Sequence, residues 1–129
     1  MNSRIQTDLS LPLIHQGKVR DIYDIDSQYM LIVASDRLSA FDVIFEQPIE
    51  SKGKILTEIA NFWFNKTNHI VQNHLTKIQL DEVLSAEEAE TLSGRAIVVK
   101  KLKPVPVEAV VRGYLIGSGW KEYQESQSV

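Results

Sequence analysis

The sequence predicts an α+β fold, in which a β-sheet is packed with one long helix. Residues 29–34 form a continuous apolar run that is short enough to be a buried strand. Residues 96–99 are apolar and largely β-branched, which favours a central strand. Between residues 55 and 75, apolar side chains recur at i, i+3, i+4 and i+7, the spacing of one helical face. We expect this face to pack on the sheet.

Length and composition are those of an ordinary soluble protein. The 129 residues suit one domain, or one domain and the start of another, and 43% hydrophobic residues can build a modest core. The net charge of −3 gives no reason to expect nucleic acid or an anionic membrane as a partner. The lack of cysteine excludes disulfides and cysteine-based zinc sites. Without a membrane-length apolar run or a signal-peptide core, we expect a cytoplasmic protein.

The first candidate site is GKVRDIYDI, residues 17–25, which follows a short apolar stretch that Pro12 keeps from forming a regular helix. If the chain is extended here, Lys18 and Arg20 share a face about 7 Å apart, and Val19 turns to the core. Two cations after Gly17 could cover nucleotide phosphates; the alternative is a solvated basic strand face. The segment has neither the P-loop spacing nor the GxGxxG of a dinucleotide fold.

A polar turn at residues 35–42 follows the first buried strand and precedes a further predicted strand at residues 43–46. Its two serines and two aspartates could carry chemistry, or they could form Asx turns and caps. Residues 48–54 form a connection with turn chemistry, in which Lys52 and Gly53 are weak site candidates.

In the long helix, the predicted stripe contains Leu56, Ile59, Ala60 and Trp63. We interpret the aromatic residues as core rather than as the wall of an adenine pocket. His69 and His74 are five positions apart rather than four, so no metal site is predicted there.

Two shorter elements follow the long helix. Residues 77–80 read as a short strand or an extended link. Ser85 opens a small helix with a capping box completed by Glu88, and Gly94 ends it.

The most informative stretch is residues 104–120, PVPVEAVVRGYLIGSGW. As a strand it would place Glu108 and Arg112 on one side, roughly 13 Å apart, so that they reach different targets. Three glycines within residues 113–119 permit a tight turn and close approach to a ligand. A guanidinium beside a Gly-Ser turn suits a carboxylate or a phosphate. The alternative is an edge strand with a solvated salt bridge and an ordinary loop.

This stretch resembles a signature of the SAICAR synthetases (phosphoribosylaminoimidazole-succinocarboxamide synthases) of purine biosynthesis. The residues that match the signature are Val105, Pro106, Val107, Glu108, Val110, Val111, Arg112, Gly117 and Ser118. GKVRD at residue 17, SDRLSAFDV at residue 35 and VKKL at residue 99 are similar to further family segments. Ile116 departs from the pattern, because the family usually has Thr, Ala or Ser there. The resemblance runs from about Gly17 to Tyr123.

The resemblance implies an antiparallel sheet with its helix over residues 1–103, which covers ATP. Residues 104–129 would then be the first strand and Gly-Ser turn of the central catalytic domain. Family members are substantially longer, and their DxKxEFG segment, which contributes to the ATP and metal site, is absent from this sequence.

For the nucleotide, the resemblance implies that Gly17, Lys18 and Arg20 hold the phosphates of ATP, with Mg²⁺ bridging phosphate oxygens. The backbone of Lys101 and Leu102 would read the adenine edge. No metal ligand is assigned among these residues.

For the other substrates, Ser39 would line the site for the imidazole compound and aspartate, while Asp36 and Arg37 would shape the loop. Asp42 would hold an amine or the ribose, or help to remove the amine proton. The remaining implied residues are Arg112, Gly117 and Ser118 for a carboxylate or ribotide phosphate, and Glu108 to orient Lys18 or a metal-bound water.

The implied activity is an ATP-dependent ligase. ATP would phosphorylate the carboxylate of CAIR, a carboxylated aminoimidazole ribotide, and the amine of L-aspartate would displace phosphate to give SAICAR, ADP and phosphate. The alternative is a truncated, non-catalytic nucleotide-binding module, since half of the expected site is missing. A kinase-like lobe is disfavoured because GxGxxG and the VAIK lysine are absent. The sequence leaves the oligomeric state open.

Overall fold

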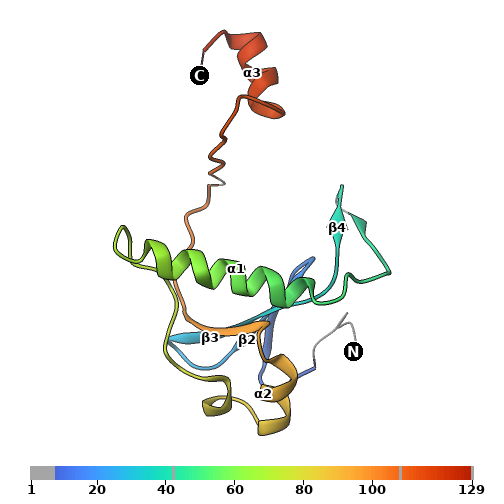
Figure 1. The fold of residues 1–129 in the computed structure, drawn as a ribbon, viewed down its shortest axis with the longest axis vertical. Coiled ribbons are helices and arrows are strands. Elements are labelled where there is room, and N and C mark those ends of the chain that lie inside the picture. The colour runs from blue at the N-terminus through green and yellow to red at the C-terminus, as the bar shows by residue number, and fades with distance from the viewer. Residues whose placement is uncertain (1–7, 42, 108, 129) are drawn as a thin grey trace.

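The computed structural model describes residues 8–41, 43–107 and 109–128. A four-stranded antiparallel sheet lies between helix α1 and helix α2 (Figure 1). Its strands, in spatial order, are β1 (Leu13–Gln16), β2 (Arg20–Asp24), β3 (Tyr29–Ala34) and β6 (Ala96–Lys100). The predicted α+β class, with an antiparallel sheet and a long helix, is confirmed.

The main core lies on the face of the sheet that α2 (Ala86–Leu92) and the 3₁₀ helix η1 (Leu80–Glu82) cover. Alternation along the strands directs every second side chain to this face. The buried residues of the core are Tyr23, Leu31, Val33, Leu84, Leu92, Ala96 and Val98. Burial of this apolar area, at about 25 cal/mol per Å², is the main stabilisation of the domain.

Helix α1 (Lys52–Thr67) packs on the opposite face of the sheet through small residues. Gly53 and Thr57 are its buried positions, and a Cβ on Gly53 would lie 2.3 Å from the carbonyl oxygen of Ala34. The Gly53 N–H donates to Asp36 Oδ1 at 2.9 Å, which satisfies one amide of the first turn. The helix therefore begins in direct backbone contact with the end of β3.

The predicted packing of the apolar stripe is wrong for most of its length. Leu56, Ile59 and Trp63 are 45%, 50% and 53% exposed. Gly53 makes the close backbone contact with the sheet, Leu56 borders a cavity between the sheet and the helix, and Ile59 and Trp63 are exposed. Lys66 Nζ lies 5.1 Å from the centroid of the Trp63 ring, a cation–π contact on this exposed face.

Helix α1 is also shorter than predicted. It ends at Thr67 rather than near residue 75, because Leu75 forms an isolated bridge with Val99 and draws residues 68–75 to the sheet. Strand β6 is correspondingly the last strand of the sheet rather than a central one, with this bridge along its outer edge.

The small helix has the predicted capping box. Glu88 N–H donates to Ser85 Oγ at 3.3 Å, and the Ser85 N–H donates to Glu88 Oε2 at 2.9 Å. Gly94 follows the helix with φ +78°, the left-handed conformation that favours glycine after a helix. The predicted link at residues 77–80 leads into η1.

Two further segments differ from expectation. The strand predicted at residues 43–46 is reduced to β5 (Val43–Ile44), which pairs with β4 (Ser39–Ala40) in a separate hairpin. The strand expected within residues 104–112 is not formed by the described residues, since no other strand lies beside this segment to pair with it. The chain instead extends away from the sheet and ends in α3 (Ser118–Ser126) (Figure 1). Assignment of residues 104–129 to a second domain stays a prediction.

Among the described residues, no helix has the length and apolarity needed to cross a membrane.

Replacement of Gly53 by alanine should destabilise the fold. The added methyl group would meet the Ala34 carbonyl at 2.3 Å, and relief of the overlap requires α1 to move from β3. Overpacking of this kind costs about 1–3 kcal/mol, which exceeds the roughly 1 kcal/mol that alanine gains over glycine in a helix. Thermal unfolding of the G53A and G113A variants measures this, because Gly113 has open space around its Cβ position. Equal stability of the two variants would contradict the proposed close contact.

Stability should fall at acidic pH through Glu88. A hydrogen bond from the Ser10 backbone, followed by bonds from the Ser85 side chain and backbone, lowers the pKa of Glu88 from 4.5 to about 2. Above pH 4.5 the ionised Glu88 is therefore more stable in the folded state than in the unfolded chain, which adds to the free energy of unfolding. This addition to the free energy of unfolding is lost as the pH falls toward 2. The E88Q variant should be less stable than the unmodified chain at pH 7, and the difference should shrink between pH 4.5 and 2. The matched E87Q variant, at an exposed neighbour, should not show this trend.

Candidate functional site

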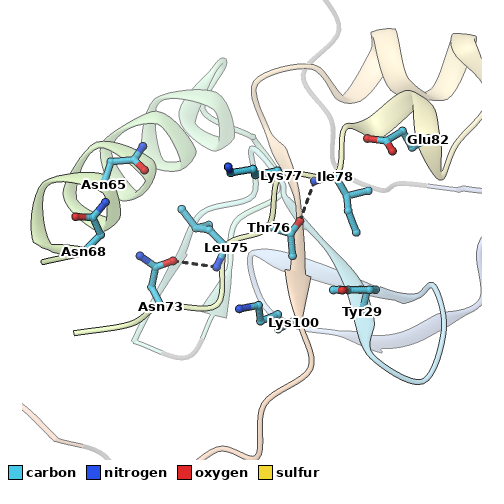
Figure 2. Close-up of a pocket in the computed structure, with 10 residues that line it drawn as sticks. All are labelled: Tyr29, Asn65, Asn68, Asn73, Leu75, Thr76, Lys77, Ile78, Glu82 and Lys100. Carbon is cyan, nitrogen blue, oxygen red and sulfur yellow. Dashed lines mark hydrogen bonds between the residues drawn. The ribbon is translucent and has the colours of Figure 1, made fainter. Parts of the chain in front are cut away.

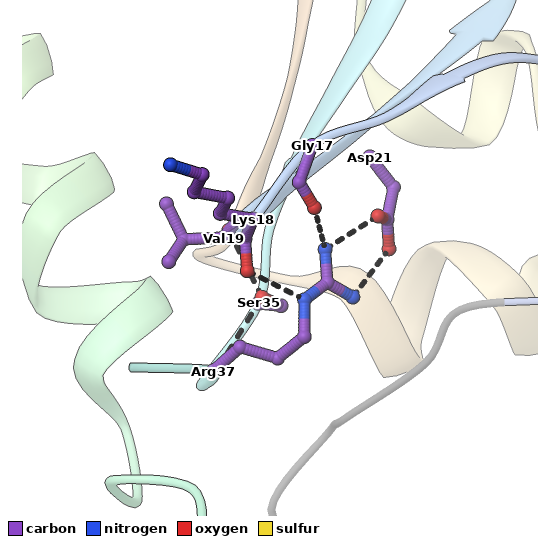
Figure 3. A network of polar contacts seen from close by, with 6 residues as sticks. All are labelled: Gly17, Lys18, Val19, Asp21, Ser35 and Arg37. Atoms are coloured by element: carbon purple, nitrogen blue, oxygen red, sulfur yellow. Dashed lines mark hydrogen bonds and ion pairs between the residues drawn. The ribbon is translucent and has the colours of Figure 1, made fainter. Parts of the chain in front are cut away.

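The turn at residues 17–20 is held from below by the buried guanidinium of Arg37 (Figure 3). Arg37 Nη2 donates to the Gly17 carbonyl at 3.0 Å, and Nε donates to the Lys18 carbonyl at 3.1 Å. The same guanidinium pairs with Asp21 at 2.6 and 3.2 Å. A buried ion pair is favourable only when its geometry and additional hydrogen bonds are good, and both conditions are met here.

Ser35 adds a second support to this turn. Its hydroxyl donates to the Val19 carbonyl at 2.9 Å, and its backbone N–H donates to the same oxygen at 3.0 Å. The Gly17 N–H closes the turn on the Arg20 carbonyl at 2.7 Å. The backbone of residues 17–20 is therefore fixed before any ligand arrives, with Arg37 shaping the neighbouring turn as well as its own loop.

The two predicted phosphate-binding cations are both exposed beside this turn. Strand β2 begins only at Arg20, so Lys18 and Val19 lie in the turn rather than in a strand. Val19 is half-buried, and with Arg20 it lines a cavity between the sheet and α1 instead of turning to the main core. The Lys18 side chain is directed away from the Arg37 guanidinium (Figure 3).

This cavity, of about 220 Å³, has apolar walls and a cationic lining. The apolar wall includes Ile32 and Ala34 from β3 and Leu56 and Phe64 from α1. The cationic side chains that line it are Arg20, Lys52 and Arg95. His74 also lines it, and burial lowers the pKa of this imidazole.

Arg112, Gly117 and Ser118 are brought together, as the signature implies. Arg112 Nη2 donates to Ser118 Oγ at 3.2 Å, and the guanidinium lies 3.6 Å from where a Gly117 Cβ would be. Gly117 has φ +63° and precedes the first turn of α3, whose amides add partial positive charge. Arg112 and Ser118 line an open hollow, and Glu122 lines it as well, so its lining carries one positive and one negative side chain. Ile116 is 59% exposed and does not disturb this arrangement.

The other predicted site residues are placed less favourably. Ser39 lies in the β4–β5 hairpin and is half-buried. The backbone N–H of Lys101 donates to the Gln28 carbonyl at 2.8 Å, so this amide is not available to an adenine. The Lys101 side chain forms an ion pair with Asp24. Leu102 is 64% exposed. Asp42 and Glu108 lie outside the described residues.

The structure does not bring all these groups into one site. The turn at residues 17–20 borders the sheet, Ser39 lies in the hairpin, and Arg112 and Ser118 lie toward the end of the C-terminal segment (Figure 1). Sequence reasoning counted Ser35 only among the polar residues of the turn at residues 35–42, and it missed Arg95. The signal for Arg95 was a cation placed immediately before an apolar strand.

A larger hollow lies beside the segment 73–78, between the end of α1 and the sheet edge at Lys100, and Figure 2 shows its lining residues. Its charged residues are Lys77, Glu82 and Lys100, a mixture without preference for one sign. The Asn73 side chain is engaged by the Leu75 N–H at 3.0 Å and by the Phe64 carbonyl at 3.2 Å. This open hollow therefore lacks the converging groups of the cavity beside Arg20.

Comparisons with known proteins agree in pointing to one family. The family model for SAICAR synthetase matches residues 13–128. Phosphoribosylaminoimidazole-succinocarboxamide synthases from Methylobacillus flagellatus and Azoarcus sp. are 70% and 61% identical over 93% of this chain. The chain spans only 41% and 39% of the length of these relatives.

Solved structures give the same result for the fold. SAICAR synthase from Saccharomyces cerevisiae, complexed with SAICAR, superposes with a TM-score of 0.87 at 43% identity, over 96% of this chain and 45% of that chain. A type-2 SAICAR synthetase in complex with ADP has a TM-score of 0.54 at 19% identity over 71% of this chain and 34% of that chain, and it supports the fold alone. By sequence and by fold, the chain belongs to the SAICAR synthetase family.

Proposed function

We propose that this chain supplies the nucleotide-covering part of an ATP-dependent ligase, which joins L-aspartate to the carboxylate of CAIR and releases SAICAR, ADP and phosphate. Family membership supports the reaction, since the yeast relative is complexed with SAICAR and the type-2 relative with ADP. The observation that carries the proposal is the prearranged turn at residues 17–20, with two exposed cations and a buried guanidinium beneath it.

In this proposal Gly17, Lys18 and Arg20 hold the phosphates of ATP. Cations near the transferring phosphoryl group offset the charge that its oxygens carry. Because Arg37 and Ser35 fix the turn through its carbonyl oxygens, little reorganisation is needed when the nucleotide binds.

Arg112, Gly117 and Ser118 orient the carboxylate or the ribotide phosphate of the second substrate. The contact between Arg112 and Ser118 supports a shared anionic ligand, to which both groups can donate. Ser39 lines the site for the imidazole compound and aspartate. Asp42 holds an amine or the ribose, or helps to remove the amine proton, and Glu108 orients Lys18 or a metal-bound water.

Mg²⁺ would accompany ATP in this proposal and offset the charge of its phosphates. No group of three or more histidine, aspartate or glutamate side chains gathers in the described part of the chain in a way that could hold a metal ion. We therefore assign no magnesium ligand and derive no step through the metal. For the adenine, the Lys101 carbonyl and the Leu102 backbone are the groups proposed, since the Lys101 amide is already bonded to Gln28.

A nucleotide-binding module without turnover is the second candidate function. It is favoured by the separation of Arg112 and Ser118 from the turn at residues 17–20, because a ligase must bring both substrates together (Figure 1). Calorimetry of this chain with ATP and Mg²⁺, followed by an assay for SAICAR with CAIR and aspartate, separates the two. Turnover supports the ligase for this chain, binding without turnover supports the module, and no binding contradicts both.

Removal of either exposed cation should weaken ATP binding. A hydrogen bond to a charged group contributes about 1.5–3 kcal/mol, so K18M and R20M should each raise the Kd for ATP roughly 10- to 100-fold. Calorimetry measures this against K77M, which removes one exposed lysine elsewhere on the chain. Unchanged affinity in both K18M and R20M would show that the phosphates bind elsewhere.

A further inference from the structure

The guanidinium of Arg95 is buried with part of its hydrogen-bonding capacity unused. Its side chain is 6% exposed, and Nη2 donates to Asp36 Oδ2 at 3.1 Å. Nε and Nη1 are buried, and neither has a hydrogen-bond partner among the residues that the structure describes. A buried donor without an acceptor destabilises the folded state, and more so when it carries charge. An acceptor is therefore expected beside at least one of these two nitrogens of Arg95.

Arg95 lines the cavity between the sheet and α1, and the lining is positively charged. Arg20 contributes a second cation from β2, and Lys52 contributes a third from the first residue of α1. No aspartate or glutamate is among the described residues that line this cavity. The nearby carboxylate of Asp36 is bonded to Arg95 and to the Gly53 N–H, so it offsets only one of the three positive charges.

The volume of the cavity restricts what could bind. At about 220 Å³ it exceeds the roughly 10–15 Å³ that a single water needs. It is smaller than the roughly 300–1,000 Å³ of pockets that enclose a whole drug-sized ligand. A small anion fits these limits, whereas an entire nucleotide does not.

We propose that this cavity is an oxyanion subsite that binds a phosphate group. Nε and Nη1 of Arg95 lie on different sides of the guanidinium, and the unpartnered donor that faces the cavity donates to one oxygen of the phosphate. Arg20 and Lys52 supply the remaining positive charge, and the first turn of α1 adds the partial charge of a helix N-terminus. The phosphate group is either free orthophosphate or the terminal phosphoryl group of a nucleotide. Only the second source rests on the proposed ATP site.

Thermal unfolding in orthophosphate, with chloride at equal ionic strength as reference, tests the subsite. The unfolding temperature should rise and saturate with phosphate, as expected for a ligand that binds the folded state. R95K, which removes the unpartnered guanidinium donors, and K52A should each raise the Kd for phosphate at least tenfold. K54A, which removes an exposed lysine from the same helix, should behave like the unmodified chain.

K52A keeps the Arg95–Asp36 pair intact, so it decides the outcome if R95K fails to fold. An unsaturable response, which is a general effect of phosphate as a salt, would overturn the proposal. A saturable response of equal strength in K52A and K54A would also overturn it, because binding would then lie outside the cavity.

Competition with nucleotides identifies the source of the phosphate. If ATP displaces orthophosphate and ADP does not, the subsite receives the terminal phosphoryl group; if phosphate binds together with ATP, it receives free phosphate. Both results uphold the subsite. Saturable phosphate binding by a chain that binds no ATP would overturn the proposed function and leave the subsite standing.

Discussion

A buried charge must be paired, and this constraint organises the end of β3. Asp36 and Arg37 are adjacent and almost completely buried, at 1% and 5% exposure. Arg37 pairs with Asp21 and holds the carbonyl groups of the turn before β2. Asp36 pairs with Arg95 ahead of β6 and accepts the Gly53 N–H in the first turn of α1. Two neighbouring residues thus join the turn at residues 17–20, the last strand and the long helix, and loss of either partner would leave an uncompensated charge in the interior.

The same contact explains why α1 is unlike an ordinary amphipathic helix. The Gly53 N–H donates to Asp36, and the missing side chain of Gly53 lets the start of the helix lie directly against the backbone at the end of β3. The sheet-facing side is then occupied by small residues, and Ile59 and Trp63 lie on the exposed side. Because the helix contacts the sheet mainly near its beginning, a cavity with Arg20, Lys52 and Arg95 in its lining remains between them.

The candidate site consists of parts that are individually well formed but not assembled. The turn at residues 17–20 is fixed by hydrogen bonds to buried groups, and Arg112 already contacts Ser118. The C-terminal segment that carries Arg112 extends from the sheet without strand pairing in its described part. Local geometry therefore favours anion binding at both places, whereas catalysis requires packing that brings them together.

The sequence by itself determined the fold class, the β3 and β6 strands, the capping box at Ser85 and Glu88, and the family signature, because each depends on local pattern or short spacing. It also placed Arg112 beside Gly117 and Ser118, which are close along the chain. Only the tertiary structure decided which face of α1 meets the sheet, that β6 is the last strand, and that the described residues within 104–112 form no strand. It alone revealed Arg95 in the cavity, 59 positions from its partner Asp36. Such features depend on contacts between residues distant in sequence, which periodicity and propensity do not encode.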